Sequence, residues 1–348
     1  MRVLSVVGNR PQFIKSAPLS AALRDAGIEE TVLHTGQHYD RELSQVFFDE
    51  LGLAEPENLD LRTADVEAME PRLRVAIEAA APDAVLVYGD TNSTLAGARA
   101  ATAVDLPVAH VEAGMRSGDL SMPEEHNRIE VDRISALLLC PDERSAETLR
   151  DEGVPGRIEV VGDVMYDSLR LFLPIARGRG PEIRKPYSVL TLHRQANTEP
   201  DRLRRLISHV NATGWTFAFP VHPRARHVMD DQGITLSRSV IPLEPLGYLE
   251  ILDLVAGSTR VVTDSGGLQK EAYWLQIPCL TLRPSTEWVD TVRMGANRLL
   301  DPSDEHAIQS LGIALNDARF PDHAPQLYGD GHASEKVAAA LLASLSAA

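Results

Sequence analysis

The sequence predicts an α/β protein with two doubly wound, Rossmann-like domains. Short apolar runs rich in β-branched residues alternate with helix-length segments along most of the chain. This alternation stops at residues 173–186, a stretch rich in Pro, Gly and Arg, and then starts again. Alternation of this kind indicates βαβ units, whose parallel sheets are covered by helices on both faces. A chain of 348 residues also exceeds the usual size of one compact core, which favours two domains.

The first half of the chain contains six candidate strands. These apolar runs lie at 2–7, 31–34, 84–88, 107–111, 136–140 and 158–161. The segments between them, such as 17–27 and 93–103, carry apolar residues at helical spacing and end near Gly or Asp. We therefore expect residues 1–172 to form the first Rossmann-like domain, followed by a linker at 173–186.

The second half repeats the pattern with five more candidate strands. They lie at 187–192, 215–219, 239–243, 260–263 and 278–282. We expect residues 187–334 to form the second domain. In doubly wound sheets, ligands bind at the carboxyl ends of the strands. Two such domains predict a cleft between them, so the residues just after each strand are the candidates for a functional site.

The composition is that of a globular protein and argues against several classes of function. The net charge of −16 argues against a nucleic-acid ligand, because the phosphate backbone would be repelled. Cys140 and Cys279 lie in apolar runs and form no ligand pattern, so a disulfide framework is not expected. The first apolar run is too short for a signal peptide, and no run is long enough to span a membrane. We therefore expect a cytoplasmic protein without a nucleic-acid or membrane partner.

Two cations follow the first strand, in the segment GNRPQFIK. Arg10 and Lys15 lie beyond Gly8 at a glycine turn, where they would neutralise a diphosphate. The segment is not a Walker loop, because it lacks a second glycine and the Lys-Ser/Thr pair. Taken alone, two such cations are more often surface charges, and that alternative stays open.

Three carboxylates, Asp90, Glu112 and Glu124, are expected at one edge of the first sheet, in separate loops. Like charges brought together raise at least one pKa, which lets a carboxyl group exchange protons near neutral pH. Asp90 has a structural alternative as the cap of the next helix, and Glu124 has one as an acid in a first helical turn. Glu112 has the weakest structural alternative, because it directly follows an apolar strand. Arg116 and Arg128 are expected to balance the charge.

The clearest phosphate signal lies in TDSGGLQKE, where a strand runs into two glycines and then a helix. Ser265, Gly266 and Gly267 would offer backbone N–H groups at a helix N-terminus, with no side chain to block close approach. Glu271 lies one helical turn further, where its carboxylate would accept hydrogen bonds from a ribose diol. A plain glycine-containing βα turn is the structural alternative.

Two histidines follow strands of the second half. His193, with Arg194 beside it, is predicted to donate to a departing phosphate oxygen. His222 would do the same, although a structural role fits its position equally well. No His-x-x-x-His or similar spacing is present, so a metal site is not expected.

Read in chain order, these motifs resemble the non-hydrolysing UDP-N-acetylglucosamine 2-epimerase family over essentially the whole chain. The resemblance is carried by the segments VVGNRPQFIKSAP, HTGQHYD, VYGDTNSTLAG, HVEAGMRSGD, MPEEHNR, VGDVMYDS, TLHR, VHPR, TDSGGLQKEA, TEW and YGDG. It implies a GT-B fold, a homodimer, and a C-terminal helix at 335–348 that packs back on the first domain. It also implies a role in polysaccharide biosynthesis.

The resemblance implies a reaction without a cofactor that converts UDP-GlcNAc to UDP-ManNAc. A base removes the C2 proton while UDP leaves C1, giving a 2-acetamidoglucal. UDP then adds back as a proton reaches C2 from the other face. Asp90, Glu112 and Glu124 would form the acid/base set, while Glu125 and Asp119 are expected to be structural. Arg10, Lys15 and the catalytic His193 would stabilise the leaving diphosphate, and Ser265, Gly266, Gly267 and Glu271 would hold UDP. Arg116, Arg194 and His222 are the remaining residues expected to bind the substrate.

Two departures from the family pattern bear on substrate and regulation. TEWVD stands where the family commonly has TERPE, so Trp288 replaces a substrate-contacting arginine. With RPQFIK, GDTNSTLAG and MPEE, this segment resembles more the subgroup acting on UDP-2,3-diacetamido-2,3-dideoxyglucuronate, which is an alternative substrate. The stretch after Leu61 also lacks a segment that helps to line an allosteric site in relatives, beside Gln37, Arg194 and His222. Activation by UDP-GlcNAc is therefore not expected.

Three other interpretations stay open. A hydrolysing 2-epimerase would release free ManNAc and UDP, because water would add to the glycal. A GT-B glycosyltransferase would share the phosphate-binding segment at 265–271, but it would seldom need three acids in the other domain. A non-catalytic UDP-sugar sensor would have no use for Asp90, Glu112 and Glu124 together.

Overall fold

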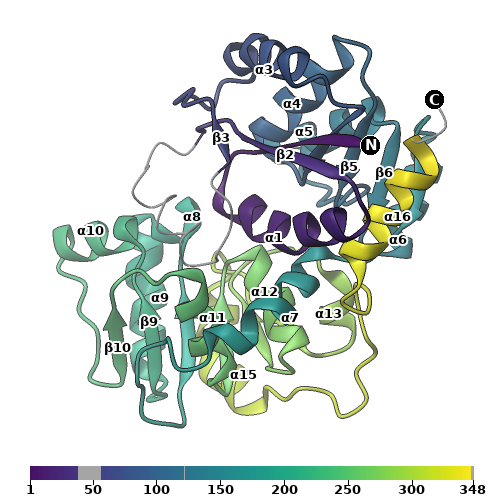
Figure 1. Cartoon of the computed structure of the whole chain (residues 1–348). Coiled ribbons are helices and arrows are strands. Elements are labelled where there is room, and N and C mark those ends of the chain that lie inside the picture. The colour runs from purple at the N-terminus through teal and green to yellow at the C-terminus, as the bar shows by residue number, and fades with distance from the viewer. Residues whose placement is uncertain (38–55, 121, 346–348) are drawn as a thin grey trace. The chain divides into compact units, whose positions relative to one another are not determined.

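The computed structural model describes residues 1–37, 56–120 and 122–345. The chain divides into two compact units: unit 1 comprises Met1–Leu171 and Gln326–Ala348, and unit 2 comprises Phe172–Pro325. Each unit contains one parallel sheet with helices packed on it (Figure 1). Within the described ranges, no helix is both long and apolar enough to cross a bilayer.

The sheet of unit 1 has seven parallel strands in the order β3-β2-β1-β4-β5-β6-β7. The strands are β1 (Arg2–Val7), β2 (Glu29–His34), β3 (Glu57–Asn58), β4 (Ala84–Tyr88), β5 (Val108–Val111), β6 (Leu137–Cys140) and β7 (Arg157–Val160). All six strands expected from the sequence are present. Strand β3 was missed because its two residues are exposed and form no apolar run. Strand β4 is buried throughout, since both faces of a parallel sheet are covered.

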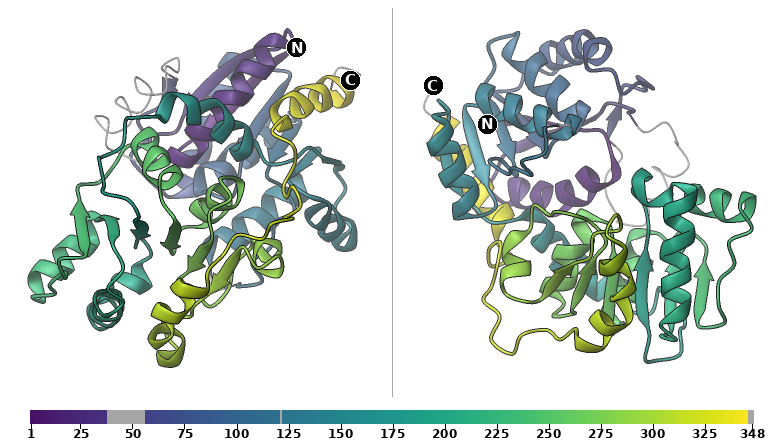
Figure 2. Two further views of the ribbon diagram at one scale, coloured as in Figure 1. Left: turned by 90° about the horizontal axis from the view of Figure 1, so that it is seen from below. Right: turned by 180° about the vertical axis from the view of Figure 1, so that it is seen from behind.

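The helices of unit 1 lie on both faces of its sheet. Helices α3, α4 and α5 pack side by side on one face, and α1 and α16 pack together on the other (Figures 1 and 2). The helices are α1 (Arg10–Asp25), α3 (Val66–Ala80), α4 (Asn92–Thr102), α5 (Pro123–Ile134), α6 (Glu143–Glu152), α7 (Val164–Ala176) and α16 (Ala333–Leu345). Helix α1 begins with a capping box formed by Asn9 and Gln12, which fixes the turn directly after β1.

Helix α7 runs from unit 1 into unit 2, so the boundary predicted at residue 172 lies inside it. Leu169, Phe172 and Ala176 are all buried and continue the helical spacing past that point. Residues 177–187 then lead to the first strand of unit 2. The Pro- and Gly-rich composition of the predicted linker therefore marks only the end of the helix.

The returning C-terminal segment is fixed to unit 1 at the start of α16. The carboxylate of Asp167 accepts hydrogen bonds from the backbone N–H groups of Ala333 and Ser334, at 3.1 and 2.6 Å. These are N–H groups that a helix N-terminus leaves without partners inside the helix. The helix predicted at 335–348 thus begins two residues earlier, and residues 346–348 lie outside the described ranges.

The sheet of unit 2 has six parallel strands in the order β10-β9-β8-β11-β12-β13. They are β8 (Ser188–Thr191), β9 (Phe217–Pro220), β10 (Val240–Leu243), β11 (Arg260–Thr263), β12 (Cys279–Thr281) and β13 (Asn297–Leu299). Val189 and Val261 belong to one buried cluster, and Leu190 and Val262 belong to another. Because successive residues of a strand face opposite sides, this sheet is also covered on both faces.

The helices of unit 2 alternate with its strands. They are α8 (Gln195–Thr198), α9 (Pro200–Ala212), α10 (Pro223–Asp231), α11 (Tyr248–Ala256), α12 (Gly266–Trp274), α13 (Val289–Arg293), α14 (Glu305–Gln309) and α15 (Leu311–Asp317). Helix α12 starts at the two glycines that follow β11. The predicted phosphate segment therefore has the strand–turn–helix form that its interpretation requires.

Candidate active site

Strands β1, β4 and β5 are neighbours in the sheet of unit 1, and their carboxyl ends bring predicted site residues together. Lys15, on α1 after β1, forms an ion pair through Nζ with Oε2 of Glu112, which follows β5. Both side chains are about nine-tenths buried. A Cβ atom placed on Gly89, at the end of β4, would lie 3.6 Å from Oε2 of Glu112 and 3.7 Å from Nζ of Lys15. Asp90 is the next residue, so the two carboxylates arrive from adjacent strands.

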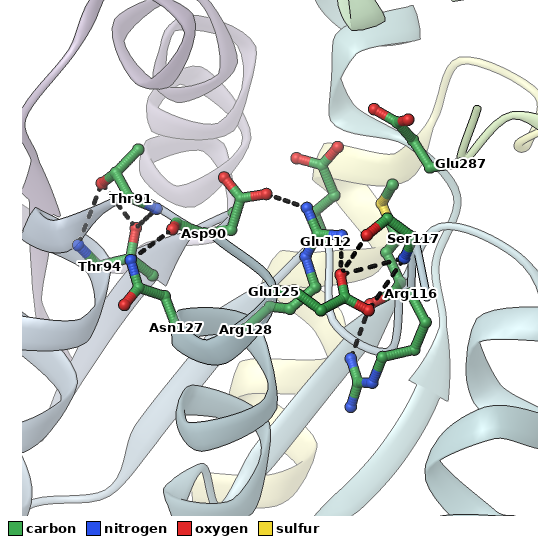
Figure 3. A network of polar contacts seen from close by, with 12 residues as sticks. Asp90, Thr91, Thr94, Glu112, Arg116, Ser117, Glu125, Asn127, Arg128 and Glu287 are labelled. Carbon is green, nitrogen blue, oxygen red and sulfur yellow. Dashed lines mark hydrogen bonds and ion pairs between the residues drawn. The ribbon is translucent and has the colours of Figure 1, made fainter. Parts of the chain in front are cut away.

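Asp90 also has a basic partner. Its Oδ2 forms an ion pair with Nη2 of Arg128, a residue of α5 that is 8% exposed (Figure 3). The other terminal nitrogen of Arg128 contacts Oε2 of Glu125 at 2.9 Å. Asp90 and Glu112 thus each contact a cation, which offsets the repulsion between neighbouring carboxylates. Of the two arginines expected to balance this acidic edge, Arg128 is the one that does so.

The helix-cap alternative for Asp90 is wrong. Thr91 is the N-cap of α4, and its hydroxyl accepts a hydrogen bond from the N–H of Thr94 at 3.2 Å (Figure 3). The backbone carbonyl of Asp90 accepts a hydrogen bond from Asn127 at 3.0 Å. The backbone of Asp90 is therefore held from α5, while its carboxylate is directed to Arg128.

Glu112 has an unusual backbone conformation. Its φ is +72°, in the left-handed region that non-glycine residues rarely adopt. The N–H groups of Glu112 and Ala113 both donate to the carbonyl of Leu139, at 3.0 and 3.2 Å, which holds the turn against the end of β6. Such a conformation costs about 1 kcal/mol or more and is concentrated at functional sites. The strain is consistent with a catalytic role for Glu112, which stays a prediction.

The two neighbouring glutamates at the start of α5 differ sharply in environment. Glu124 is exposed in the first turn, whereas Glu125 is buried. The Glu125 carboxylate accepts hydrogen bonds from the backbone of Ser117 and Gly118 and from the Ser117 hydroxyl (Figure 3). Burial alone would raise the pKa of Glu125, but these bonds and Arg128 hold it below its usual value. Glu125 therefore organises the loop before α5, as the sequence indicated.

Arg116 lies in a different set of contacts from Asp90 and Glu112. Its guanidinium contacts Asp132 at 2.8 Å and donates to both carboxylate oxygens of Glu152, at 2.9 and 2.8 Å. Arg116 thus joins the loop after β5 to helices α5 and α6. Its predicted role in binding the substrate stays a prediction, as does that of Arg10, which is exposed at the first residue of α1.

In unit 2, the turn after β11 forms a helix N-terminus with room beside it. Ser265 is the N-cap of α12, and Gly266 and Gly267 are its first two residues. A Cβ atom on Gly267 would meet no other atom within 4 Å, so the backbone is open to solvent there. Glu271, one turn further along, is buried, and its Oε1 accepts a hydrogen bond from the Tyr248 hydroxyl at 3.1 Å.

His193 and Arg194 are fixed by Asp264, a fully buried residue that the sequence analysis missed. The Asp264 carboxylate accepts the backbone N–H groups of both residues at 2.9–3.1 Å and lies 3.8 Å from Nδ1 of His193. Burial lowers the pKa of His193, although Asp264 acts in the opposite direction. The imidazole is therefore mostly neutral near pH 7, with Asp264 on its Nδ1 side. The position of Asp264 directly before Ser265 was the signal available in the sequence.

His222 lies beside His193, with the ring centroids 5.6 Å apart in an edge-to-face arrangement. Its pKa is lowered by burial and then by the charges of His193 and Arg224. Its Nδ1 also accepts a hydrogen bond from the N–H of Arg224 at 3.2 Å, which caps α10. His222 thus has the structural role that the sequence left open, and its role toward a ligand stays a prediction.

The TEW segment packs against the glycine turn of α12. A Cβ atom on Gly266 would lie 3.0 Å from Oε1 of Glu287 and 3.8 Å from Nε1 of Trp288. Burial would raise the pKa of Glu287, but its 2.9 Å ion pair with Arg283 holds it below the usual value. The Lys270 ammonium lies 3.9 Å from the ring centroid of Trp288. The tryptophan that departs from the family pattern therefore lies beside the predicted phosphate turn.

Known proteins resemble this chain over nearly its whole length. The sequence profile of UDP-N-acetylglucosamine 2-epimerase matches residues 21–342. The UDP-2,3-diacetamido-2,3-dideoxy-D-glucuronate 2-epimerase of Pseudomonas aeruginosa is 41% identical, over 97% of this chain and 98% of that protein. The UDP-N-acetylglucosamine 2-epimerase of Methanocaldococcus jannaschii is 34% identical, over 97% of this chain and 98% of that protein.

Solved structures agree with the sequence relatives. The Methanocaldococcus jannaschii UDP-GlcNAc 2-epimerase in complex with UDP-GlcNAc and UDP is similar with a TM-score of 0.85 and 32% identity, over 99% of this chain and 100% of that chain. The Neisseria meningitidis UDP-GlcNAc 2-epimerase bound to UDP-GlcNAc has a TM-score of 0.87 and 28% identity, with the same coverage. The predicted fold class is confirmed: the chain has a GT-B-like fold made of two Rossmann-like units.

Proposed function

The chain belongs to the UDP-N-acetylglucosamine 2-epimerase family, and we propose that it inverts the configuration at C2 of a UDP-2-acetamido sugar. Epimerases are isomerases, so the chain is an enzyme of that class. The observation that supports the proposal best is the edge of unit 1, where Asp90 and Glu112 each contact a cation. Neither carboxylate is used as a helix cap, and Glu112 is held in a strained conformation.

The proposed reaction proceeds by elimination and re-addition. A carboxylate of unit 1 takes the C2 proton as the C1–O bond breaks, and the electron pair of that bond leaves with UDP. The products of this step are a 2-acetamidoglucal and UDP. UDP then adds back to C1 while C2 receives a proton on the opposite face. Because the C2 proton is weakly acidic, base and leaving-group stabilisation must act together.

Groups of both units take part in this proposal. Asp90, Glu112 and Glu124 form the acid/base set, and Lys15 with Arg10 neutralises the departing diphosphate. The ligands assigned to UDP are Ser265, Gly266, Gly267 and Glu271, and the further substrate contacts are Arg116, Arg194 and His222. His193 is supported as a group at the departing diphosphate, because the Asp264 carboxylate holds its backbone N–H just after β8.

Two substrates are candidates within this reaction. The family as a whole favours interconversion of UDP-GlcNAc and UDP-ManNAc. The 41% identity to the Pseudomonas aeruginosa enzyme favours UDP-2,3-diacetamido-2,3-dideoxyglucuronate. Trp288 supports the second candidate, because a tryptophan beside Gly266 replaces the arginine common in the family. We expect a homodimer in the cytoplasm with a role in polysaccharide biosynthesis.

The experiment that tests the proposal is incubation with each UDP-sugar in D2O, followed by NMR of the C1 and C2 signals. Deuterium at C2 together with the C2 epimer supports the proposal and identifies the substrate. Release of the free sugar and UDP would show a hydrolysing 2-epimerase instead. Absence of exchange with both sugars would contradict the proposal, and it would leave a glycosyltransferase or a non-catalytic sensor.

A further inference from the structure

His110, a fully buried residue of β5, has a hydrogen-bond acceptor at each ring nitrogen. Its Nε2 lies 2.7 Å from the carbonyl oxygen of Gly89, and its Nδ1 lies 2.7 Å from Oδ1 of Asp132. A carbonyl oxygen only accepts hydrogen bonds, and so does an ionised carboxylate. We infer that His110 is an imidazolium that positions the two loops carrying Asp90 and Glu112. The role assigned to those loops rests on the proposed function.

Asp132 has donors other than His110 on its carboxylate. It is fully buried, and its Oδ2 accepts hydrogen bonds from Nη1 of Arg116 at 2.8 Å and from the N–H of Gly114 at 3.2 Å. Burial would raise the pKa of Asp132, but its contacts with His110 and then with Arg116 hold it below the usual value. Nδ1 of His110 therefore faces a carboxylate that has no proton to donate.

The two bonds of the ring reach the backbone on either side of the carboxylate pair. Gly89, whose carbonyl oxygen accepts the hydrogen bond from Nε2, directly precedes Asp90 and has a φ of +62°. Gly114, whose N–H donates to Asp132, lies two residues after Glu112. His110 and Asp132 thus form a continuous hydrogen-bonded connection between the turn after β4 and the turn after β5.

The charges along this connection alternate and balance. The His110 imidazolium is followed by Asp132, then by the guanidinium of Arg116, and then by Glu152 on α6. A neutral ring would place a lone pair against either the Gly89 carbonyl or the Asp132 carboxylate, and the repulsion would displace one of the turns. A displacement of 1 Å at a reacting group reduces rates by about 10²-fold. His110 therefore acts through Asp90 and Glu112 and does not itself contact the sugar.

The charge of the ring is tested directly by nitrogen-15 NMR of the full chain labelled at histidine. The signals of His110, among the 11 histidines of the chain, are identified by their loss in His110→Gln and by their shift in Asp132→Asn. Because each ring nitrogen faces an acceptor, the spectrum of His110 is expected to show a proton on both nitrogens. A spectrum with one unprotonated ring nitrogen would overturn the inference. This result does not depend on the proposed function.

The positioning role is tested by kinetics of C2 exchange. Asp132→Asn and His110→Gln are each expected to lower kcat by about 10²-fold while KM and the Kd of UDP stay within about twofold. The matched control is Glu130→Gln, which removes another carboxylate of α5 from a half-exposed ion pair with Arg99 and should leave kcat unchanged. An unchanged kcat in a folded Asp132→Asn variant would refute the role. If both variants fail to fold, the NMR spectrum of the wild type decides whether His110 is an imidazolium. A wild type without C2 exchange would refute the proposed function but not the charge of His110.

Discussion

Replacing Glu112 by Gln is the most informative single change in the chain. The amide has almost the same shape as the carboxylate but cannot take up a proton from C2. A positioned general base contributes about 10²- to 10⁴-fold to a rate, so we expect C2 exchange to fall by about 10³-fold. This corresponds to about 4 kcal/mol of transition-state stabilisation. The Kd of UDP should change by no more than about twofold, because Glu112 is assigned to the sugar and is not among the groups assigned to UDP.

The same substitution has a second, structural consequence. Lys15 and Glu112 are each about 11% exposed, so the amide leaves a nearly buried ammonium with a weaker partner. We expect the free energy of unfolding to fall by about 1–3 kcal/mol. Glu112→Gly should be more stable than an alanine at this position by about 1 kcal/mol, since glycine adopts a φ of +72° without strain.

Exchange is measured by NMR in D2O, UDP binding by calorimetry and stability by urea unfolding. The control is Glu143→Gln, which changes an exposed ion pair with Arg150 and should affect none of the three. Exchange in Glu112→Gln within about tenfold of the wild-type rate would refute the assignment of Glu112 as an acid/base group. A loss of UDP affinity without a loss of exchange would show that Glu112 acts in binding.

Three further predictions concern other parts of the molecule. Arg128→Met should lower the kcat of C2 exchange by about 10-fold or more, because Asp90 loses its ion pair with the guanidinium. Kinetics in which only KM changed would contradict this prediction. Gly267→Ala should fold normally, since a Cβ there meets no atom within 4 Å. Calorimetry should nevertheless show UDP binding that is weaker by about tenfold or more, because the methyl group would block the helix N-terminus. Unchanged binding would show that the diphosphate binds elsewhere. Burial raises the pKa of Glu30 in the folded chain above its ordinary value of 4.5. As pH rises, the unfolded chain therefore loses this proton before the folded chain does. The stability that Glu30 contributes is lost as pH rises through the folded pKa. The stability of Glu30→Gln relative to the wild type should therefore increase as pH rises above about 4.5, as measured by urea unfolding. A variant that is more stable than the wild type only at acid pH would refute this prediction.

The sequence predicted the parts of the fold that depend on local patterns. All eleven apolar runs became strands, and all of them except β2, β7 and β10 are largely buried, as expected where a parallel sheet is covered on both faces. The strands β3 and β13 were missed, since each is a two- or three-residue edge pairing with no such run. The two units divide between Leu171 and Phe172, inside α7, and the buried Ala176 continues this helix into the Pro-rich stretch.

The sequence also predicted which residues gather at the strand ends, but not which of them pair. Lys15 and Glu112 are 97 positions apart, and their contact follows from β1, β4 and β5 being neighbours. The capping role expected as an alternative for Asp90 belongs to Thr91, one residue later. Asp and Thr are both common N-cap residues, so the sequence alone does not say which of the two caps the helix. The positioning role of His110 could not be predicted from the sequence, because His110 lies in the buried strand β5. Its significance comes from Asp132, which reaches it from a helix 22 residues further on.

The central claim is that a carboxylate of unit 1 exchanges the C2 proton of a UDP-2-acetamido sugar during epimerisation. Mass spectrometry of the sugar product formed in D2O tests it most directly, with UDP-GlcNAc and with UDP-2,3-diacetamido-2,3-dideoxyglucuronate as substrates. The account predicts one deuterium at C2 in every epimerised molecule, with the bond to UDP restored. An epimer formed without deuterium at C2, or no epimer from either sugar, would contradict it.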